Sequence, residues 1–299
     1  MNISMKSGVS TAEWSDGPWD VALVGPAVDE RGRAAIEFAK SRTGTTIVLE
    51  YRADSFTFLV DGRSIEADEL STGLPNLASA AFLLESTTLG FVEVFLACRA
   101  LVRAGTNGFH LAYVEPKEYK TPRRREVLYR RAFELSSEVP GYRAIPGAAV
   151  ILTDRRPQHG VFFLGFEERR LDVALEDFQT LRPSNCSVVF GVPAYKPGWE
   201  AHAFANNVRV LETKRLSGGV HFCGAENPAG AYEVLLEIKA SLEKDARMVV
   251  APIGTKPNGI GAALFAALHP EVGLLYDHPK RSAGRTEQIS RWHLYHIGL

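Results

Sequence analysis

Cysteine, excess charge of either sign and long apolar runs are all scarce in this sequence of 299 residues. The three cysteines, Cys98, Cys186 and Cys223, are far apart, which excludes a disulfide framework and a CxxC metal pair. The net charge of -1 gives the chain no global field that would attract nucleic acid or a membrane. No apolar run is long enough to cross a membrane as a helix, so no membrane contact is expected.

Signatures of several nucleotide-dependent and hydrolytic enzymes are also missing. The sequence contains neither a GxxxxGK[ST] loop nor a GxGxxG motif after its first strand, which argues against a P-loop ATPase and a nicotinamide dehydrogenase. GxSxG and HExxH do not occur either. His293 and His296 face opposite sides of an expected strand, so they are poor metal partners. We therefore expect no metal, and the catalytic residues and the cofactor stay unknown.

The length of the chain predicts two domains. Residues 1–18 are polar and lack the apolar core of a signal peptide, which predicts a flexible leader and, with the few cysteines, a cytoplasmic protein. We expect the first domain over residues 19–116, a connector rich in Arg, Pro and Gly over residues 117–152, and the second domain over residues 153–299.

Strand and helix patterns alternate through both expected domains. An apolar run at 19–26 precedes a helical pattern at 29–42, and a strong helical pattern at 89–105 ends at Gly105. Residues 55–67 alternate in polarity around Asp61-Gly62, which predicts a hairpin. Alternation of this kind favours a parallel sheet covered by helices on both faces.

Four units of the first half recur in the same order in the second half, which predicts an internal duplication. The matched segments are 20–39 with 160–179, 45–51 with 186–193, 80–101 with 248–268, and 108–116 with 271–279. The predicted fold class is therefore α/β, with two tandem Rossmann-like domains and mostly parallel sheets.

Two strand-to-helix turns are rich in groups that bind anions. One contains Gly254, Thr255 and Lys256, and the other contains Ser86, Thr87 and Thr88. Open parallel sheets bind ligands beyond the carboxyl ends of their strands, and the N-terminus of a helix attracts anions. The hydroxyls add donors, and the lysine adds a positive charge. These residues are predicted to hold a phosphate, with helix capping by Ser and Thr and a solvent-directed lysine as the alternatives.

Further candidates follow other predicted strands. Glu167 and Arg170 open a helix, where they either hold a ribose hydroxyl and a phosphate or form a solvated first turn. Trp199 lies in an expected irregular loop over 192–207, where it either stacks on a base or packs as part of the loop surface. Asp277 and Arg285 are expected beside the 254–259 turn, with a solvated basic loop as the alternative. The basic stretch 120–131 is interpreted as a solvated connector rather than a nucleic-acid contact.

The stretches "PIGTKP" and "ESTTLG" resemble the strand-turn-helix units of the CRISPR-associated Rossmann fold (CARF) domains and related sensor domains of bacterial antiviral systems. In that family the corresponding turn contacts cyclic or linear oligoadenylate. The resemblance implies a sensor in antiviral defence that binds such a ligand through these turns. No appended nuclease, protease or winged-helix pattern is present in the sequence.

Three hypotheses of function remain open. The first is a two-lobed protein that senses a phosphorylated small molecule or a short oligonucleotide. The second is an enzyme that hydrolyses or transfers a phosphoryl or nucleotidyl group, with Lys256 stabilising the developing charge. The third is a non-catalytic assembly partner, and a protein partner or a homo-oligomer is compatible with each hypothesis.

Overall fold

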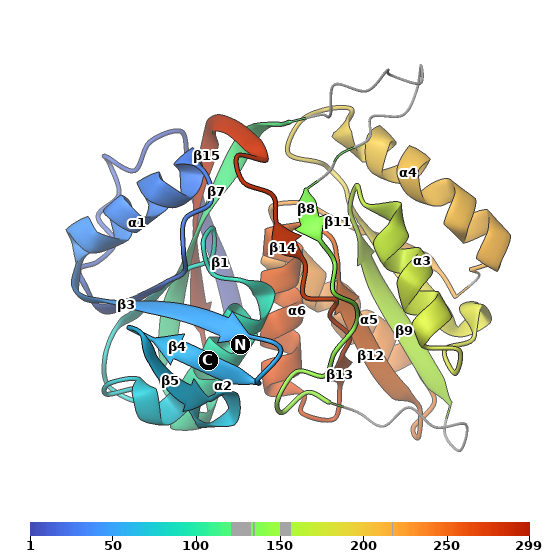
Figure 1. Cartoon of the computed structure of the whole chain (residues 1–299), viewed down its shortest axis with the longest axis horizontal. Helices are drawn as coiled ribbons and strands as arrows, with labels where there is room; N and C mark the ends of the chain where they lie inside the picture. Colours follow the sequence, from blue (N-terminus) through green and yellow to red (C-terminus); the bar gives the residue numbers. More distant parts are fainter. Residues whose placement is uncertain (121–132, 134, 150–156, 217) are drawn as a thin grey trace. The chain divides into compact units, whose positions relative to one another are not determined.

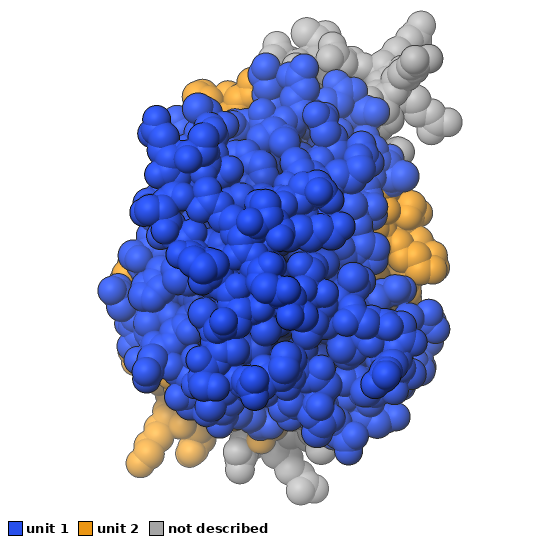
Figure 2. Space-filling view, turned by 90° about the vertical axis from the view of Figure 1, so that its left-hand side faces the viewer, with its two compact units in different colours: residues 1–120, 283–299 blue, residues 121–282 orange. Residues whose placement is uncertain are grey.

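The structure is a computed structural model that describes residues 1–120, 133, 135–149, 157–216 and 218–299 (Figure 1). The chain divides into two compact units, residues 1–120 with 283–299 (unit 1) and residues 121–282 (unit 2), which Figure 2 colours separately. These bounds differ from the predicted ones, because residues 283–299 belong to the first unit. Apart from Lys120, the basic stretch 120–131 lies outside the described residues.

Unit 1 is built on a mixed sheet in which eight described strands are paired. In spatial order they are β1 (Asn2–Gly8), β15 (Thr286–Gly298), β7 (Gly108–Tyr119), β6 (Phe82–Glu85), β2 (Trp19–Val24), β3 (Thr43–Arg52), β4 (Thr57–Val60) and β5 (Arg63–Glu66). The central strands β7, β6, β2 and β3 are parallel, whereas the pairs at both edges are antiparallel. The prediction of a mostly parallel sheet is therefore wrong for unit 1.

Two long helices accompany this sheet, α1 (Glu30–Arg42) and α2 (Phe91–Ala104), together with the short 3-10 helix η1 (Ala67–Gly73). The β2–α1–β3 and β6–α2–β7 connections run in opposite directions along the sheet, so right-handed crossovers place α1 and α2 on opposite faces. α1 buries Ala35, Phe38 and Ala39 in a core with Trp292 of β15. Complete burial of a side chain such as Phe38 stabilises the fold by about 1.5–3 kcal/mol.

Local signals in the first half are confirmed where a turn or cap fixes the backbone. Asp61 and Gly62 join β4 to β5, and both have positive φ values, 47° and 82°. These values suit a tight hairpin turn, for which an Asp-Gly pair is a preferred sequence. α2 ends at Gly105, whose φ of 73° is left-handed and whose N–H reaches the last carbonyls of the helix.

The amino-terminal segment differs from the predicted flexible leader. β1 pairs antiparallel with β15 along its whole length, from Asn2 opposite Gly298 to Gly8 opposite Trp292. The signal was missing from local sequence because the partner strand lies almost a full chain length away. The apolar residues of this mostly exposed edge strand, Ile3 and Met5, are too few to predict a strand.

Unit 2 contains a sheet in which all described strand pairs are parallel. The spatial order is β11 (Val220–Cys223), β10 (Cys186–Gly191), β9 (Gln158–Leu164), β12 (Arg247–Pro252) and β13 (Gly273–Leu274). The helices are α3 (Glu168–Asp177), α4 (Trp199–Lys214), α5 (Pro228–Ser241) and α6 (Lys256–Leu268), with the 3-10 helix η2 (Pro183–Asn185). A small antiparallel pair joins β8 (Ser136–Glu138) to β14 (Lys280–Arg281).

The stretch 192–207 is not the irregular loop that the sequence predicts, because α4 begins at Trp199 and runs to Lys214. The glycines and prolines at 193–198 form the preceding turn, and they conceal the start of the helix. Phe204 and Val210 of α4 then pack on the core that α3 and the sheet share. Tertiary burial therefore decides the conformation of this segment.

The four matched strands have the same parallel order in both units, β3-β2-β6-β7 in unit 1 and β10-β9-β12-β13 in unit 2. The α/β class is confirmed. The internal duplication stays a prediction. Of the helices that the structure describes, none is long and apolar enough to pass through a membrane.

Candidate functional site

The strand order of unit 2 reverses between β9 and β12, which are direct neighbours. β9 leads through α3 toward β10, whereas β12 leads through α6 toward β13 on the other side. The turns that leave the two strands lie close together, since a Cβ atom added to Gly165 would be 3.2 Å from the carbonyl oxygen of Ile253. In open α/β sheets, such a reversal opens a crevice beyond the carboxyl ends of the strands.

The turn after β12 contains the predicted residues Gly254, Thr255 and Lys256. A Cβ atom on Gly254 would be 3.2 Å from the Cβ of Phe163, so the turn approaches the end of β9 closely. Thr255 is the N-cap of α6, and its Oγ1 lies 3.4 Å from the backbone nitrogen of Asn258. The helix that follows is almost completely buried, while Gly254, Thr255 and Lys256 are half-buried at its start. The turn is thus the partly exposed end of a buried helix.

The hydroxyl of Thr255 already has partners within the protein. Its Oγ1 lies 2.6 Å from the carbonyl oxygen of Ala225 and 2.8 Å from Oδ1 of Asn258. Asn258, which is 1% exposed, donates from Nδ2 to the carbonyl oxygen of Gly224 at 3.0 Å. These bonds join the start of α6 to the turn after β11. Thr255 therefore acts in the structure as the capping residue that the alternative interpretation describes.

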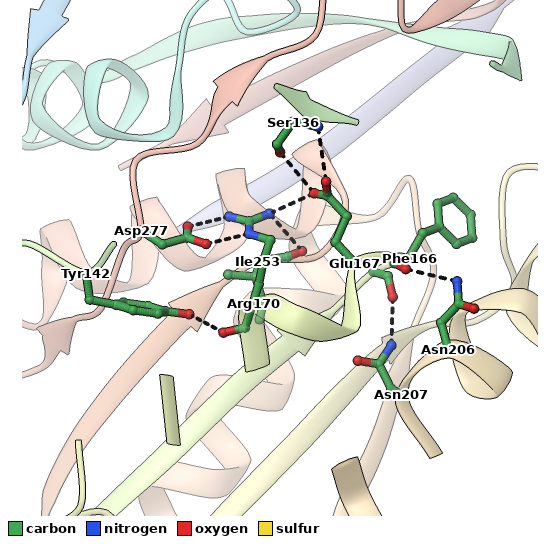
Figure 3. Close-up of polar contacts among 10 residues, drawn as sticks. Ser136, Tyr142, Phe166, Glu167, Arg170, Asn206, Asn207, Ile253 and Asp277 are labelled. Carbon is green, nitrogen blue, oxygen red and sulfur yellow. Dashed lines mark hydrogen bonds and ion pairs between the residues drawn. The ribbon is translucent and has the colours of Figure 1, made fainter. Parts of the chain in front are cut away.

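A buried ion pair lies beneath the two turns (Figure 3). Arg170 of α3 donates from Nε and Nη2 to the two carboxylate oxygens of Asp277, both at 2.6 Å. Its Nη1 lies 3.4 Å from the carbonyl oxygen of Ile253 and 3.8 Å from Oε2 of Glu167. Asp277 is fully buried and Arg170 nearly so. Burial alone would lower the pKa of Arg170, but the hydrogen bonds and charge of Asp277 raise it above its ordinary value.

This cluster connects four segments of unit 2. Arg170 joins the first turn of α3 to the ends of β12 and β13, and the hydroxyl of Tyr142 donates to the carbonyl oxygen of Arg170 at 2.8 Å. Glu167 accepts from the N–H of Ser136 at 3.0 Å and from its hydroxyl at 3.1 Å. The predicted residues Glu167, Arg170 and Asp277 are therefore brought together, and they hold the turns in place through contacts with protein groups.

Two amides of α4, which the sequence places in a loop that could read the edge of a base, instead complete the support of the turn after β9. Asn206 donates from Nδ2 to the carbonyl oxygen of Phe166 at 2.9 Å, and Asn207 donates to that of Gly165 at 2.8 Å (Figure 3). Both amides are buried. An Asn-Asn pair inside a helix is a weak signal, since asparagine is a poor helix former without a specific partner.

The sequence predicts Trp199 in a loop, where it either stacks on a base or packs as part of the loop surface. Trp199 is the first residue of α4 and is 4% exposed, and its ring meets Phe166 edge-on with 6.0 Å between ring centroids. The described contact thus packs α4 against the turn after β9.

Arg285, which was predicted to lie beside the 254–259 turn, belongs to unit 1, where the N–H of Lys120 donates to its carbonyl oxygen at 2.9 Å.

In the corresponding turn of unit 1, a carboxylate of the protein itself accepts the hydrogen bonds of the turn. Glu85 is fully buried at the end of β6, and its carboxylate accepts the N–H groups of Thr87 at 2.7 Å and Thr88 at 2.9 Å as well as the Thr88 hydroxyl. Ser86 donates to the carbonyl oxygen of Ala112 at 2.6 Å. These donors therefore serve the fold. In unit 2 the segment that follows β12 has Ile253-Gly254, with no carboxylate, before the capping threonine.

Within the described residues, no group of three or more His, Cys, Asp and Glu side chains has a geometry that would hold a metal ion. Sequence comparisons with protein families and with curated proteins find no match for the chain.

Proposed function

We propose that unit 2 binds a phosphorylated nucleotide or short oligonucleotide at the carboxyl ends of β9 and β12. One observation carries the proposal: a glycine-threonine-lysine turn that opens a buried helix lies at the point where the strand order of a parallel sheet reverses. Gly254 lets the turn pack closely against the end of β9, and the start of α6 and the charge of Lys256 both favour an anion. In this proposal Thr255 shapes the turn, whereas Lys256 contacts the phosphate.

The buried cluster has a positioning role in this proposal. Arg170, Asp277 and Glu167 fix the turn after β9 relative to the turn after β12, and a rigid support keeps a ligand site preorganised. Ser86, Thr87 and Thr88 have no ligand in this proposal, since the carboxylate of Glu85 uses the N–H groups of both threonines. The proposed site is thus in unit 2 alone.

The proposal extends to the CARF-like sensor that the sequence resemblance implies, in bacterial antiviral defence, with oligoadenylate as the ligand. The spatial order of the sheet in unit 2 is that of the first five strands in a doubly wound Rossmann sheet, which supports a Rossmann-like unit. The shared order of the four matched strands in both units supports the proposed duplication. The three cysteines are free thiols, in keeping with a reducing cytoplasm.

Titration calorimetry of the full chain tests this function. The panel contains adenosine mono- and triphosphate, linear oligoadenylates, cyclic dinucleotides and cyclic oligoadenylates. We expect at least one ligand to bind, and Lys256→Ala to raise its Kd about tenfold, equivalent to about 1.4 kcal/mol. Lys244→Ala is the matched control, because this exposed lysine precedes the amino end of β12. The absence of binding by every anion, or equal loss in both variants, would contradict the proposal.

The same samples distinguish a sensor from an enzyme and from an assembly partner. Chromatography of the incubated ligand detects turnover, and a turnover rate that Lys256→Ala abolishes would favour the enzyme. Light scattering with and without ligand measures the oligomeric state. The assembly role would be favoured if neither the wild type nor the double variant Thr255→Ala/Lys256→Ala bound a ligand, and if both formed the same oligomer or bound the same protein partner.

A further inference from the structure

Three polar side chains form a row across adjacent strands of unit 1. Ser7 of β1 lies directly opposite His293 of β15, and its Oγ is 2.7 Å from Nδ1 of that ring. The other ring nitrogen, Nε2, lies 3.1 Å from Oε2 of Glu115 on β7. A hydroxyl, an imidazole and a carboxylate are therefore connected in series, which is the arrangement of a nucleophile, its base and the group that orients the base.

Burial differs along this row in a way that suits catalysis. His293 is 1% exposed and Glu115 is 4% exposed, whereas Ser7 is exposed on the edge strand of the sheet. A carboxylate at Nε2 places the ring proton there and leaves Nδ1 as an acceptor for the Ser7 hydroxyl. The rings of Tyr113 and Tyr295 stack with His293, each with centroids 6.1 Å apart, and restrict its orientation. Only the serine is accessible to a substrate in solution.

We propose that Ser7 is the nucleophile of an esterase site, with His293 as the general base and Glu115 as the positioning residue. As Oγ of Ser7 forms a bond to the ester carbonyl carbon, its proton passes to Nδ1 of His293. The carbon–oxygen bond to the leaving alcohol then breaks, and the alcohol departs with that proton. A water molecule that takes the place of the alcohol beside Ser7 passes a proton to Nδ1 of His293 and attacks the acyl-serine, and Ser7 recovers its proton as the carboxylic acid leaves.

The surroundings of Ser7 indicate an apolar acyl group. Met5 and Val9 lie two residues to either side of Ser7, and both expose apolar side chains, at 46% and 78%. Side chains alternate along a strand, so Met5 lies on the same face as Ser7. An acyl chain bonded to Ser7 would have apolar surface beside it. We therefore expect butyrate and longer esters to react faster than acetate.

The same pair of strands contains an internal comparison. Ser4 also lies opposite a histidine, His296, and both are exposed. Among the described residues, His296 has no carboxylate hydrogen-bonded to its ring, and its described ring contact is with His110, with 4.9 Å between the centroids. Ser4 therefore has an opposing imidazole without the orienting carboxylate. It provides a control serine on the same strand.

Hydrolysis of p-nitrophenyl butyrate by the full chain, with a fluorophosphonate label located by peptide mass spectrometry, tests the proposal. We expect label on Ser7, hydrolysis reduced to the buffer rate in Ser7→Ala, and wild-type hydrolysis in Ser4→Ala. Glu115→Gln should lower kcat about 10²- to 10⁴-fold with little change in KM. Ser7→Ala removes a partner of the buried His293 ring, so thermal unfolding of each variant is measured to show that it is folded at the assay temperature.

Two outcomes would overturn the proposal of an esterase site. The first is equal hydrolysis by the wild type and Ser7→Ala, and the second is label on Ser4 or another residue instead of Ser7. The site shares no residue with the proposed nucleotide site of unit 2, so the ligand titrations neither support nor weaken it.

Discussion

Replacing Asp277 by asparagine should destabilise unit 2 strongly, because it removes the charge that compensates a buried guanidinium. Asp277 is fully buried, Arg170 is 9% exposed, and the two hydrogen bonds that join them are 2.6 Å long. Breaking a buried pair by removing one partner typically costs about 3–5 kcal/mol. For a unit of this size that loss lowers the melting temperature by roughly 6–20 °C.

The assay is thermal and urea unfolding of the full chain labelled with fluorotryptophan, with the transition of unit 2 followed by the ¹⁹F resonance of Trp199, the only tryptophan of that unit. Asp172→Asn is the matched control, since Asp172 forms a partly exposed pair with Lys214 at 3.4 Å, and such pairs contribute at most about 1 kcal/mol. The double variant Arg170→Met/Asp277→Leu should be more stable than Asp277→Asn, because it removes the buried guanidinium together with its partner.

The reasoning would be refuted if Asp277→Asn unfolded within about 1 kcal/mol of the wild type. It would also be refuted if the double variant were the least stable of the three proteins. Either result would mean that the guanidinium finds water or another acceptor when Asp277 is lost. The positioning role of this cluster in the proposed nucleotide site would then fail as well.

Three further predictions concern acid stability, helix packing and the thiols. Burial opposes ionisation of Asp29, but the charge of Arg31 and hydrogen bonds hold its pKa below the ordinary 3.8. The contribution of Asp29 to the free energy of unfolding is therefore present above that pH and lost as the pH falls below it. Asp29→Asn should flatten the decline in urea stability between about pH 4 and 2. Gly261→Ala should cost about 1–3 kcal/mol in urea unfolding, because its Cβ would overlap the carbonyl oxygen of Pro228; no loss would mean that α5 and α6 separate freely. The three buried cysteines should resist a thiol reagent at pH 8 in the folded protein and react fully in denaturant, and fast labelling of the folded chain would contradict their burial.

The sequence alone determined what depends on neighbours along the chain. The Asp61-Gly62 hairpin and the end of α2 at Gly105 are predicted, because a turn or cap is fixed by a few adjacent backbone dihedrals, whereas the cap at Thr255 is the alternative to the predicted phosphate contact. The alternation of strands and helices likewise predicted the α/β class. Glu167 and Asp277 are separate candidates in the sequence, each after a predicted strand, and the structure brings both to Arg170.

Only the tertiary structure decided which donors have partners and which segments pair at long range. Local sequence cannot show that Asp277 neutralises Arg170, since the two residues are over a hundred positions apart. It also cannot show that β1 pairs with β15 and brings Ser7 to His293. The backbone N–H and C=O groups of a strand can form hydrogen bonds with any other strand. The burial and packing of side chains across the whole sheet therefore select which strand becomes the partner.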